Sequence, residues 1–101
     1  MQKYNIAKIQ DLKEKRGKCY TIDGEQIALF KVQEKVFAIS NNCPHQHFAK
    51  LHESIVEENI ITCPMHGWCF DLVTGKSTNA SGKLKTYSVE VINENVFVEM
   101  E

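Results

Sequence analysis

Two cysteine–histidine pairs are the residues of this chain whose types and spacing indicate chemistry. The first is Cys43-Pro-His45, and the second, Cys63-Pro-Met-His66, begins eighteen positions after His45. Each pair has a proline after its cysteine, which favours a loop over a continuing strand. Two thiolates and two imidazoles on two facing loops would hold a metal centre, either a zinc ion or an iron–sulfur cluster.

The first interpretation is a cluster of two irons and two sulfides. In this arrangement Cys43 and Cys63 bind one iron, while His45 and His66 bind the other, so each loop gives one ligand to each iron. Two ferric ions, two sulfides and two thiolates have no net charge, whereas four thiolates would leave the oxidised centre doubly negative. An added electron is therefore accepted more easily, at roughly −150 to +300 mV against about −400 mV for clusters with four cysteines.

Zinc is the alternative metal. Zn²⁺ accepts two cysteines and two histidines, and a zinc-stabilised interaction module would have no redox role. Structural zinc sites usually space the ligands within each pair by two to four residues. The single residue between Cys43 and His45 is tighter than that habit, so the iron–sulfur interpretation is favoured.

The elements that must position these ligands are short strands separated by polar turns, which predicts an all-β fold. The first half of the chain has strands at Tyr4 to Ile9, then at 19–22, 27–32 and 36–39, with one helical turn from Asp11 to Lys15. Asp23-Gly24 and residues 33–35 are typical hairpin turns. These strands are expected to form a meander.

The second half continues the same pattern. Ile55-Val56 and 60–62 flank a polar turn at 57–59, and the strand that ends at Thr62 runs directly into Cys63. Further strands are expected at 68–72, 84–92 and 96–100. The sheet should therefore direct the second ligand loop.

Size and composition limit the possible functions. With 101 residues and 43% hydrophobic content, we expect one domain, residues 1–101. No basic stripe with interleaved aromatic residues occurs, so nucleic acid is not expected as a partner. We also expect neither a signal peptide nor a membrane span, and four cysteines without an export signal indicate metal ligands or reduced thiols in the cytoplasm.

The residues around the ligands carry a family resemblance. Cys43-Pro-His45, seventeen intervening residues and the segment from Cys63 to Gly75 resemble the Rieske iron–sulfur motif of small soluble ferredoxins. The segments 37–39 and 84–89 also match, so the resemblance covers most of the chain. It implies an antiparallel β-sandwich with two cluster-binding loops at one end, residues about 43–54 and 63–75, and a [2Fe–2S] cluster held by Cys43, His45, Cys63 and His66.

The resemblance is to the low-potential branch of the family. Respiratory members carry a loop disulfide at the positions of Phe48 and Met65, and hydroxyl donors to cluster sulfur at the positions of Trp68 and Phe70. Without those donors, the added negative charge is less stabilised. This chain also lacks the usual first-loop glycines, and Asn79-Ala80-Ser81 replaces the usual prolines after the Thr-Gly turn.

The implied function is one-electron transfer, with no catalysis by the chain alone. Family analogy predicts a flavoprotein ferredoxin reductase that uses NAD(P)H as donor and a terminal ring-hydroxylating oxygenase as acceptor. A small subunit of a reductase complex, of the nitrite reductase type, is the alternative within the same family.

Other residues near the motif receive less specific predictions. Cys19 is interpreted as a buried thiol, and Cys69 as a partly exposed thiol that is not a ligand. His47 and His52 are predicted to be solvated side chains beside the first loop, with a docking or pH role as the alternative for His47. Trp68 is expected to pack in the core or against a loop.

Overall fold

The computed structural model describes residues 2–41, 51–63, 67–79 and 82–100. Strands account for most of this part, and its only helical segments are two three-residue 3₁₀ turns, so the all-β prediction is confirmed. The elements are β1 (Gln2–Lys8), η1 (Ile9–Asp11), β2 (Gly17–Ile22), β3 (Glu25–Val32), β4 (Lys35–Ser40), η2 (Leu51–Glu53), β5 (Ile55–Glu57), β6 (Ile60–Thr62), β7 (Cys69–Asp71), β8 (Thr86–Tyr87), β9 (Val89–Ile92) and β10 (Asn95–Met100). Within the described ranges, no helix has the length and apolar character needed to cross a bilayer.

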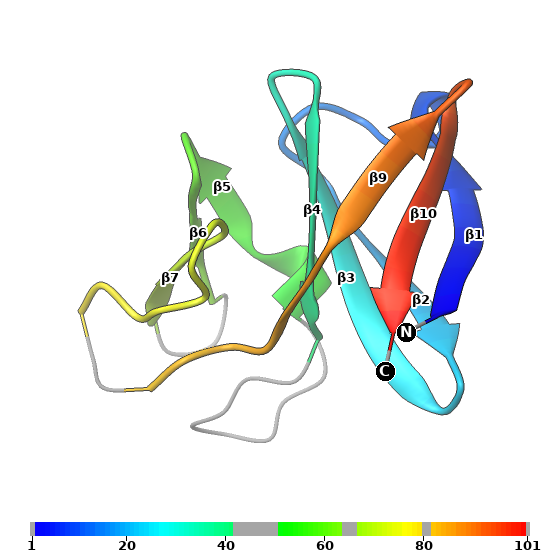
Figure 1. Cartoon of the computed structure of the whole chain (residues 1–101). Helices are drawn as coiled ribbons and strands as arrows, with labels where there is room; N and C mark the ends of the chain where they lie inside the picture. Colours follow the sequence, from blue (N-terminus) through cyan, green and yellow to red (C-terminus); the bar gives the residue numbers. More distant parts are fainter. Residues whose placement is uncertain (1, 42–50, 64–66, 80–81, 101) are drawn as a thin grey trace.

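The strands form three antiparallel sheets, with orders β1-β10-β9, β2-β3-β4-β8 and β5-β6-β7. The two larger groups of strands lie together on one side of the molecule, and the small sheet β5-β6-β7 projects on the other (Figure 1). The small sheet is the one that leads into Cys63. It therefore carries one of the two predicted ligand loops.

Tight hairpin turns set the register of the strands. The turns at 23–24, 33–34 and 93–94 each have two consecutive residues with positive φ, for example 51° and 80° at Asp23 and Gly24. This is the backbone of type I′ turns, whose twist matches that of the flanking strands. The hairpins predicted at 23–24 and 33–35 are confirmed, as is the one around 57–59.

Two local predictions were wrong. The helical turn lies at Ile9–Asp11 and not at Asp11 to Lys15, because the later segment pairs with β3: Lys15 N donates to Lys31 O at 2.7 Å and Lys15 has φ +58°. The expected strand 84–92 is interrupted at Ser88. Its first part pairs with β4 and its second with β10, so the chain changes sheets there.

Two hydrophobic cores share β3, a strand whose apolar side chains are buried on both faces. Ala28, Phe30 and Val32 face the core that lies against the small sheet, whereas Ile27 and Leu29 face the core under β1 and β10. The first core also contains Leu51, Val56, Ile61, Cys63, Phe70, Leu72 and Leu84. Because it joins β3 and β4 to the strands before and after Cys63, it fixes the position of that cysteine.

Candidate metal centre

Cys63 is the predicted ligand that the structure describes. It follows the last residue of β6, the central strand of the small sheet, and its side chain is 1% exposed within the first core. Cys43, His45 and His66 lie outside the described residues, and so do His47 and Phe48. A buried thiol at the end of a paired strand has the position that a cluster ligand needs, so the residue fits the predicted role.

Main-chain hydrogen bonds close the neck of the second loop. The neck consists of Cys63, where the loop begins, and of Gly67 and Trp68, where it ends. Cys63 N donates to Trp68 O at 2.7 Å, and Gly67 N donates to Cys63 O at 3.1 Å. Gly67 has φ +71°, a conformation that favours glycine. The chain therefore returns to the sheet immediately after the predicted ligand His66.

Asn41 closes the neck of the first loop. Its side chain is 0% exposed, and its Oδ1 accepts hydrogen bonds from His52 N at 2.8 Å and from His52 Nδ1 at 3.0 Å. Its main-chain oxygen accepts from Leu51 N at 3.2 Å. Asn41 thus joins the chain just before the predicted loop to η2, which lies near the end of that loop.

The two necks belong to one packed unit. Leu51, at the end of the first loop, and Cys63, at the start of the second, are both buried in the first core. The prediction that a sheet directs the second loop is confirmed. Among the residues that the structure describes, no three potential metal ligands lie together, since three of the four predicted ligands fall outside that part.

The strand after the second loop, β7, pairs with β6 on one edge, and residues 77–79 bind its other edge. Asn79 Oδ1 accepts from Cys69 N at 2.9 Å, and Asn79 Nδ2 donates to Gly67 O at 3.0 Å. Thr78 N and Ser77 Oγ both donate to Cys69 O at 3.0 Å. Sequence reasoning missed these contacts and those of Asn41; the replacement of the usual prolines by a segment that starts at Asn79 was the available signal.

The aromatic residues beyond the second loop have packing roles. Trp68 is partly buried against the first core, which confirms the packing prediction, and Phe70 is fully buried within that core. Cys69 is half-buried, and its thiol lies 3.3 Å from Thr62 Oγ1. Cys19 lies in β2 and is half-buried, not fully buried as predicted, and this partial burial raises the pKa of its thiol.

His52 differs from its predicted role. We expected a solvated imidazole, but the ring is 28% exposed and bonded to Asn41. Because Asn41 Oδ1 is an acceptor, His52 Nδ1 must carry the proton that is donated to it. The other ring nitrogen, Nε2, then faces Glu53 Oε2 at 3.9 Å.

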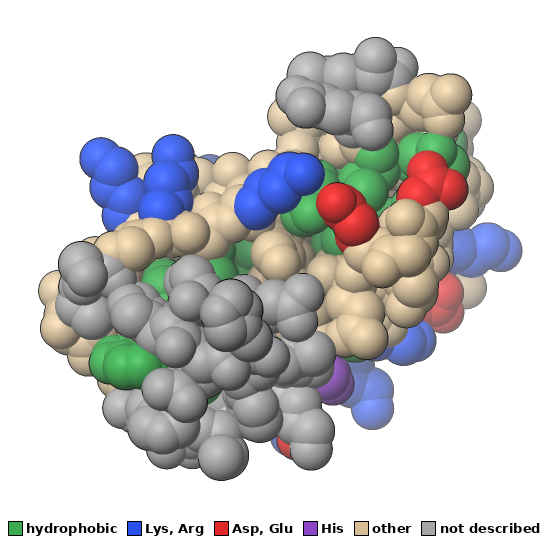
Figure 2. Space-filling view, turned by 90° about the horizontal axis from the view of Figure 1, so that it is seen from below, with side chains coloured by type: hydrophobic (Ala, Val, Ile, Leu, Met, Phe, Trp, Pro, Cys, Tyr) green, Lys and Arg blue, Asp and Glu red, His purple; other side chains and the backbone are tan. Residues whose placement is uncertain are grey.

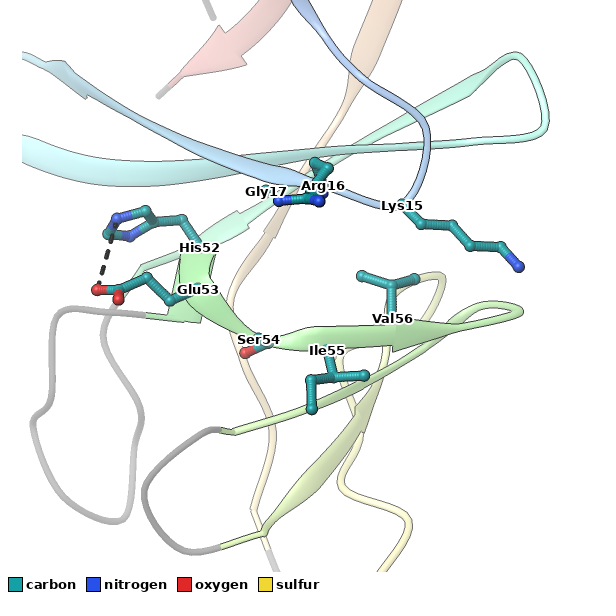
Figure 3. Close-up of a pocket in the computed structure, with 8 residues that line it drawn as sticks. All are labelled: Lys15, Arg16, Gly17, His52, Glu53, Ser54, Ile55 and Val56. Atoms are coloured by element: carbon teal, nitrogen blue, oxygen red, sulfur yellow. Dashed lines mark ion pairs between the residues drawn. The ribbon is translucent and has the colours of Figure 1, made fainter.

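A groove of about 510 Å³ runs beside η2 and β5. His52 and Glu53 lie at one end and Lys15 at the other, with Val56 and Ile55 between them (Figure 3). Ile55 is 65% exposed, the highest value among the large hydrophobic side chains of the described residues. Figure 2 shows the molecule from below the view of Figure 1, and on this face patches of hydrophobic side chains lie between charged ones.

Comparison with known proteins gives a family. A family model described as a Rieske-like [2Fe-2S] domain matches residues 3–99. The chain belongs to the Rieske-like [2Fe-2S] family. The cofactor of this Rieske protein is a Rieske-type [2Fe–2S] cluster, as the resemblance of its sequence to the Rieske motif implied.

Relatives of this Rieske protein are electron-transfer components. It is 35% identical over 82 residues to the ferredoxin component of the naphthalene 1,2-dioxygenase/salicylate 5-hydroxylase systems of a Ralstonia species, with 79% of this chain and 78% of that protein covered. It is similar to the ferredoxin of carbazole 1,9a-dioxygenase from Nocardioides aromaticivorans, with a TM-score of 0.92, 26% identity and all of both chains covered.

A second solved structure shares the fold. It is described as a putative NADH-dependent nitrite reductase small subunit from Mycobacterium tuberculosis, and it covers 96% of this chain and 93% of its own at a TM-score of 0.90. At 22% identity, this similarity concerns the fold alone. It does not separate a ferredoxin from a reductase subunit.

Proposed function

We propose that this Rieske protein is a one-electron carrier between an NAD(P)H-dependent flavoprotein reductase and a terminal oxygenase. The observation that carries the proposal is Cys63, buried at the closed neck of a loop within a chain of the Rieske-like family. The relatives named as ferredoxin components support a carrier without catalysis of its own. We further propose that residues 1–101 act as a single domain.

The proposed ligands are Cys43 and Cys63 for one iron and His45 and His66 for the other. When bound, the cluster supplies a site that stores one electron. The protein contributes loop necks closed by hydrogen bonds, and Cys63 is held within the first core. Holding the ligands in advance reduces the rearrangement that accompanies a change of charge.

We place the reduction potential toward the lower end of the Rieske range, near −150 mV in order of magnitude. Trp68 and Phe70 stand where high-potential members have hydroxyl donors, and the Phe70 ring is fully buried in the first core. Neither side chain can donate an O–H group to cluster sulfur. Fewer donors leave the reduced state less stabilised.

We propose a cytoplasmic location. Within the part of the chain that the structure describes, Cys19, Cys63 and Cys69 form no disulfide, which fits a reducing compartment. The flavoprotein reductases that such carriers use are served by cytoplasmic NAD(P)H. Fractionation of the source cells would test the location.

Electron transfer can be tested with the components of a relative's system. The purified protein is mixed anaerobically with NADH and the reductase component of a naphthalene 1,2-dioxygenase system, and bleaching of its visible absorption is followed. We expect bleaching only when the reductase is present, and reoxidation when the oxygenase component and oxygen are added. A protein that has no visible absorption, or that stays oxidised with every dioxygenase reductase supplied, would contradict the proposal.

The two alternatives are distinguished by other measurements. A nitrite reductase type subunit would be purified as a stable complex with a larger reductase chain, whereas a carrier elutes alone. A zinc-stabilised module would be colourless and would contain one zinc ion per chain. Membership of the Rieske-like family supports the iron–sulfur centre over zinc.

A further inference from the structure

We propose that Asn79 is a positioning residue for the second ligand loop. Its carboxamide takes the place of a neighbouring strand along residues 67–69 and so holds the segment that follows the ligand His66. The inference rests on the proposed function for the role of His66. It goes beyond that function because it assigns a role to a residue that is not a ligand.

The geometry is that of a sheet pair made by one side chain. Gly67 precedes β7 and has φ +71°, so it is not itself extended, but its C=O and the N–H of Cys69 both meet the side chain of Asn79, as the C=O and N–H of residues two apart in a strand meet a neighbouring strand. Asn79 offers one acceptor and one donor to this pair: Oδ1 accepts from Cys69 N at 2.9 Å and Nδ2 donates to Gly67 O at 3.0 Å. We call these two bonds the Asn79 clamp.

The clamp begins where main-chain pairing on this edge of β7 ends. One edge of β7 pairs with β6, with Cys69 opposite Thr62. On the other edge, Phe70 forms a bridge with Ser77, and the main chain of Thr78 donates to Cys69 O at 3.0 Å. Asn79 extends this contact from Cys69 to Gly67, whose main-chain oxygen also accepts from Cys69 Sγ at 3.6 Å.

Asn79 is well suited to a test because it is exposed. Truncation of Asn79 creates no cavity in the core. Truncation of Asn41, the residue that closes the first loop, would create one because Asn41 is fully buried. Loss of Asn79 should therefore loosen Gly67 and Cys69 and leave the two hydrophobic cores packed. Since Gly67 is bonded covalently to His66, the freedom gained is passed directly to the proposed ligand.

The experiment compares Asn79→Ala and Asn79→Asp with the wild type. Asn79→Asp keeps the acceptor for Cys69 N but loses the donor to Gly67 O. Its exchange and bleaching rates should therefore lie between those of the wild type and those of Asn79→Ala. Asn5→Ala is the matched control, because Asn5 is an exposed asparagine of β1 whose side chain also makes a hydrogen bond, to Asn95 Oδ1 at 3.5 Å. Three quantities are measured: amide deuterium exchange of the peptide that covers Cys69, bleaching by an iron chelator, and the paramagnetic resonance spectrum after reduction.

We expect Asn79→Ala to exchange faster at Cys69, to bleach roughly ten-fold faster, as the loss of two hydrogen bonds implies, and to give a shifted or broadened resonance. The Asn5→Ala control should match the wild type in all three. Unchanged exchange at Cys69 would overturn the clamp. A lower unfolding temperature with unchanged resonance and bleaching would show a merely structural residue and would also overturn the proposal.

Failure of the proposed function gives a different result. A wild-type protein without iron would contradict the electron carrier, and it would do so before any variant is compared. Deuterium exchange at Cys69 can be compared between wild type and Asn79→Ala in the same metal state, so it still decides whether the clamp exists.

Discussion

Gly17 of β2 lies directly against the backbone of His52 in η2. A Cβ placed on Gly17 would collide with the carbonyl oxygen of His52 and would approach Phe30 Cε1 to 2.6 Å. The sheet β2-β3-β4-β8 and η2, near the end of the first ligand loop, are therefore in contact at Gly17, a position that has no side chain. This close approach is how the scaffold holds the first loop.

Substitution of this glycine should separate the two parts. Gly17→Ala is expected to lower the free energy of unfolding by about 2 kcal/mol, because the overpacked site forces η2 away from β2. Urea unfolding followed by circular dichroism measures the change.

Gly24→Asn is the control for this variant. Gly24 has open space around it and φ +80°, which asparagine tolerates in a tight turn. We expect a change of less than about 1 kcal/mol for the control. Equal stability of Gly17→Ala and wild type would mean that the contact between β2 and η2 is not needed.

The buried aromatic ring beneath the second loop should be essential for stability. Phe70 is fully buried, so Phe70→Ala is expected to cost about 4 kcal/mol through lost burial and a residual cavity. Val73→Ala, in the adjacent turn and 58% exposed, should change stability by less than about 0.5 kcal/mol. Chemical denaturation of both variants tests this, and a small effect of Phe70→Ala would argue against the packing described for the first core.

Two cysteines near the second loop should differ sharply in their effect on the cluster. Cys63→Ser should lose nearly all iron and visible colour, because it removes a proposed thiolate ligand. Cys69→Ser should keep both, since the Cys69 thiol contacts Thr62 Oγ1 and is not a proposed ligand. Iron and acid-labile sulfide are determined on both proteins. Loss of the cluster from Cys69→Ser with retention in Cys63→Ser would reverse the assignment.

Stability should fall in alkali through Tyr87. Burial of the ring and a 3.1 Å hydrogen bond to Glu25 raise the pKa of Tyr87 to about 12. The unfolded chain releases this proton near pH 10. Between about pH 10 and about pH 12 the unfolded state thus binds fewer protons than the folded state, so stability decreases as pH rises, while below pH 10 the contribution is constant.

Comparison of wild type with Tyr87→Phe isolates this effect from other groups that titrate in alkali. Urea midpoints at a series of pH values should fall more steeply for the wild type within that window. Parallel curves for the two proteins would show that Tyr87 does not titrate as described.

Much of the fold could be predicted from the sequence because its signals are local. Alternating apolar residues and two-residue polar turns specified most strands, including the strand that leads into Cys63. The break at Ser88 was missed because both halves of 84–92 have strand character. Only the competition between β4 and β10 as pairing partners shows where the chain changes sheets.

The family and its cofactor could also be predicted, since four donors with flanking prolines and glycine are a dense local motif. The asparagines that close the loops could not. Asn41 and Asn79 act through side-chain bonds to residues ten or more positions away, and nothing in their neighbours marks those partners. The bonded state of His52 was missed for the same reason.

The central claim is a two-iron cluster held by two sulfur and two nitrogen ligands, and the paramagnetic resonance spectrum of the dithionite-reduced protein, recorded together with its iron content, tests it most directly. We predict about two irons per chain and the signal of a nitrogen-ligated diiron centre. A signal typical of a cluster with four cysteines, or anaerobically purified protein without iron, would contradict the account.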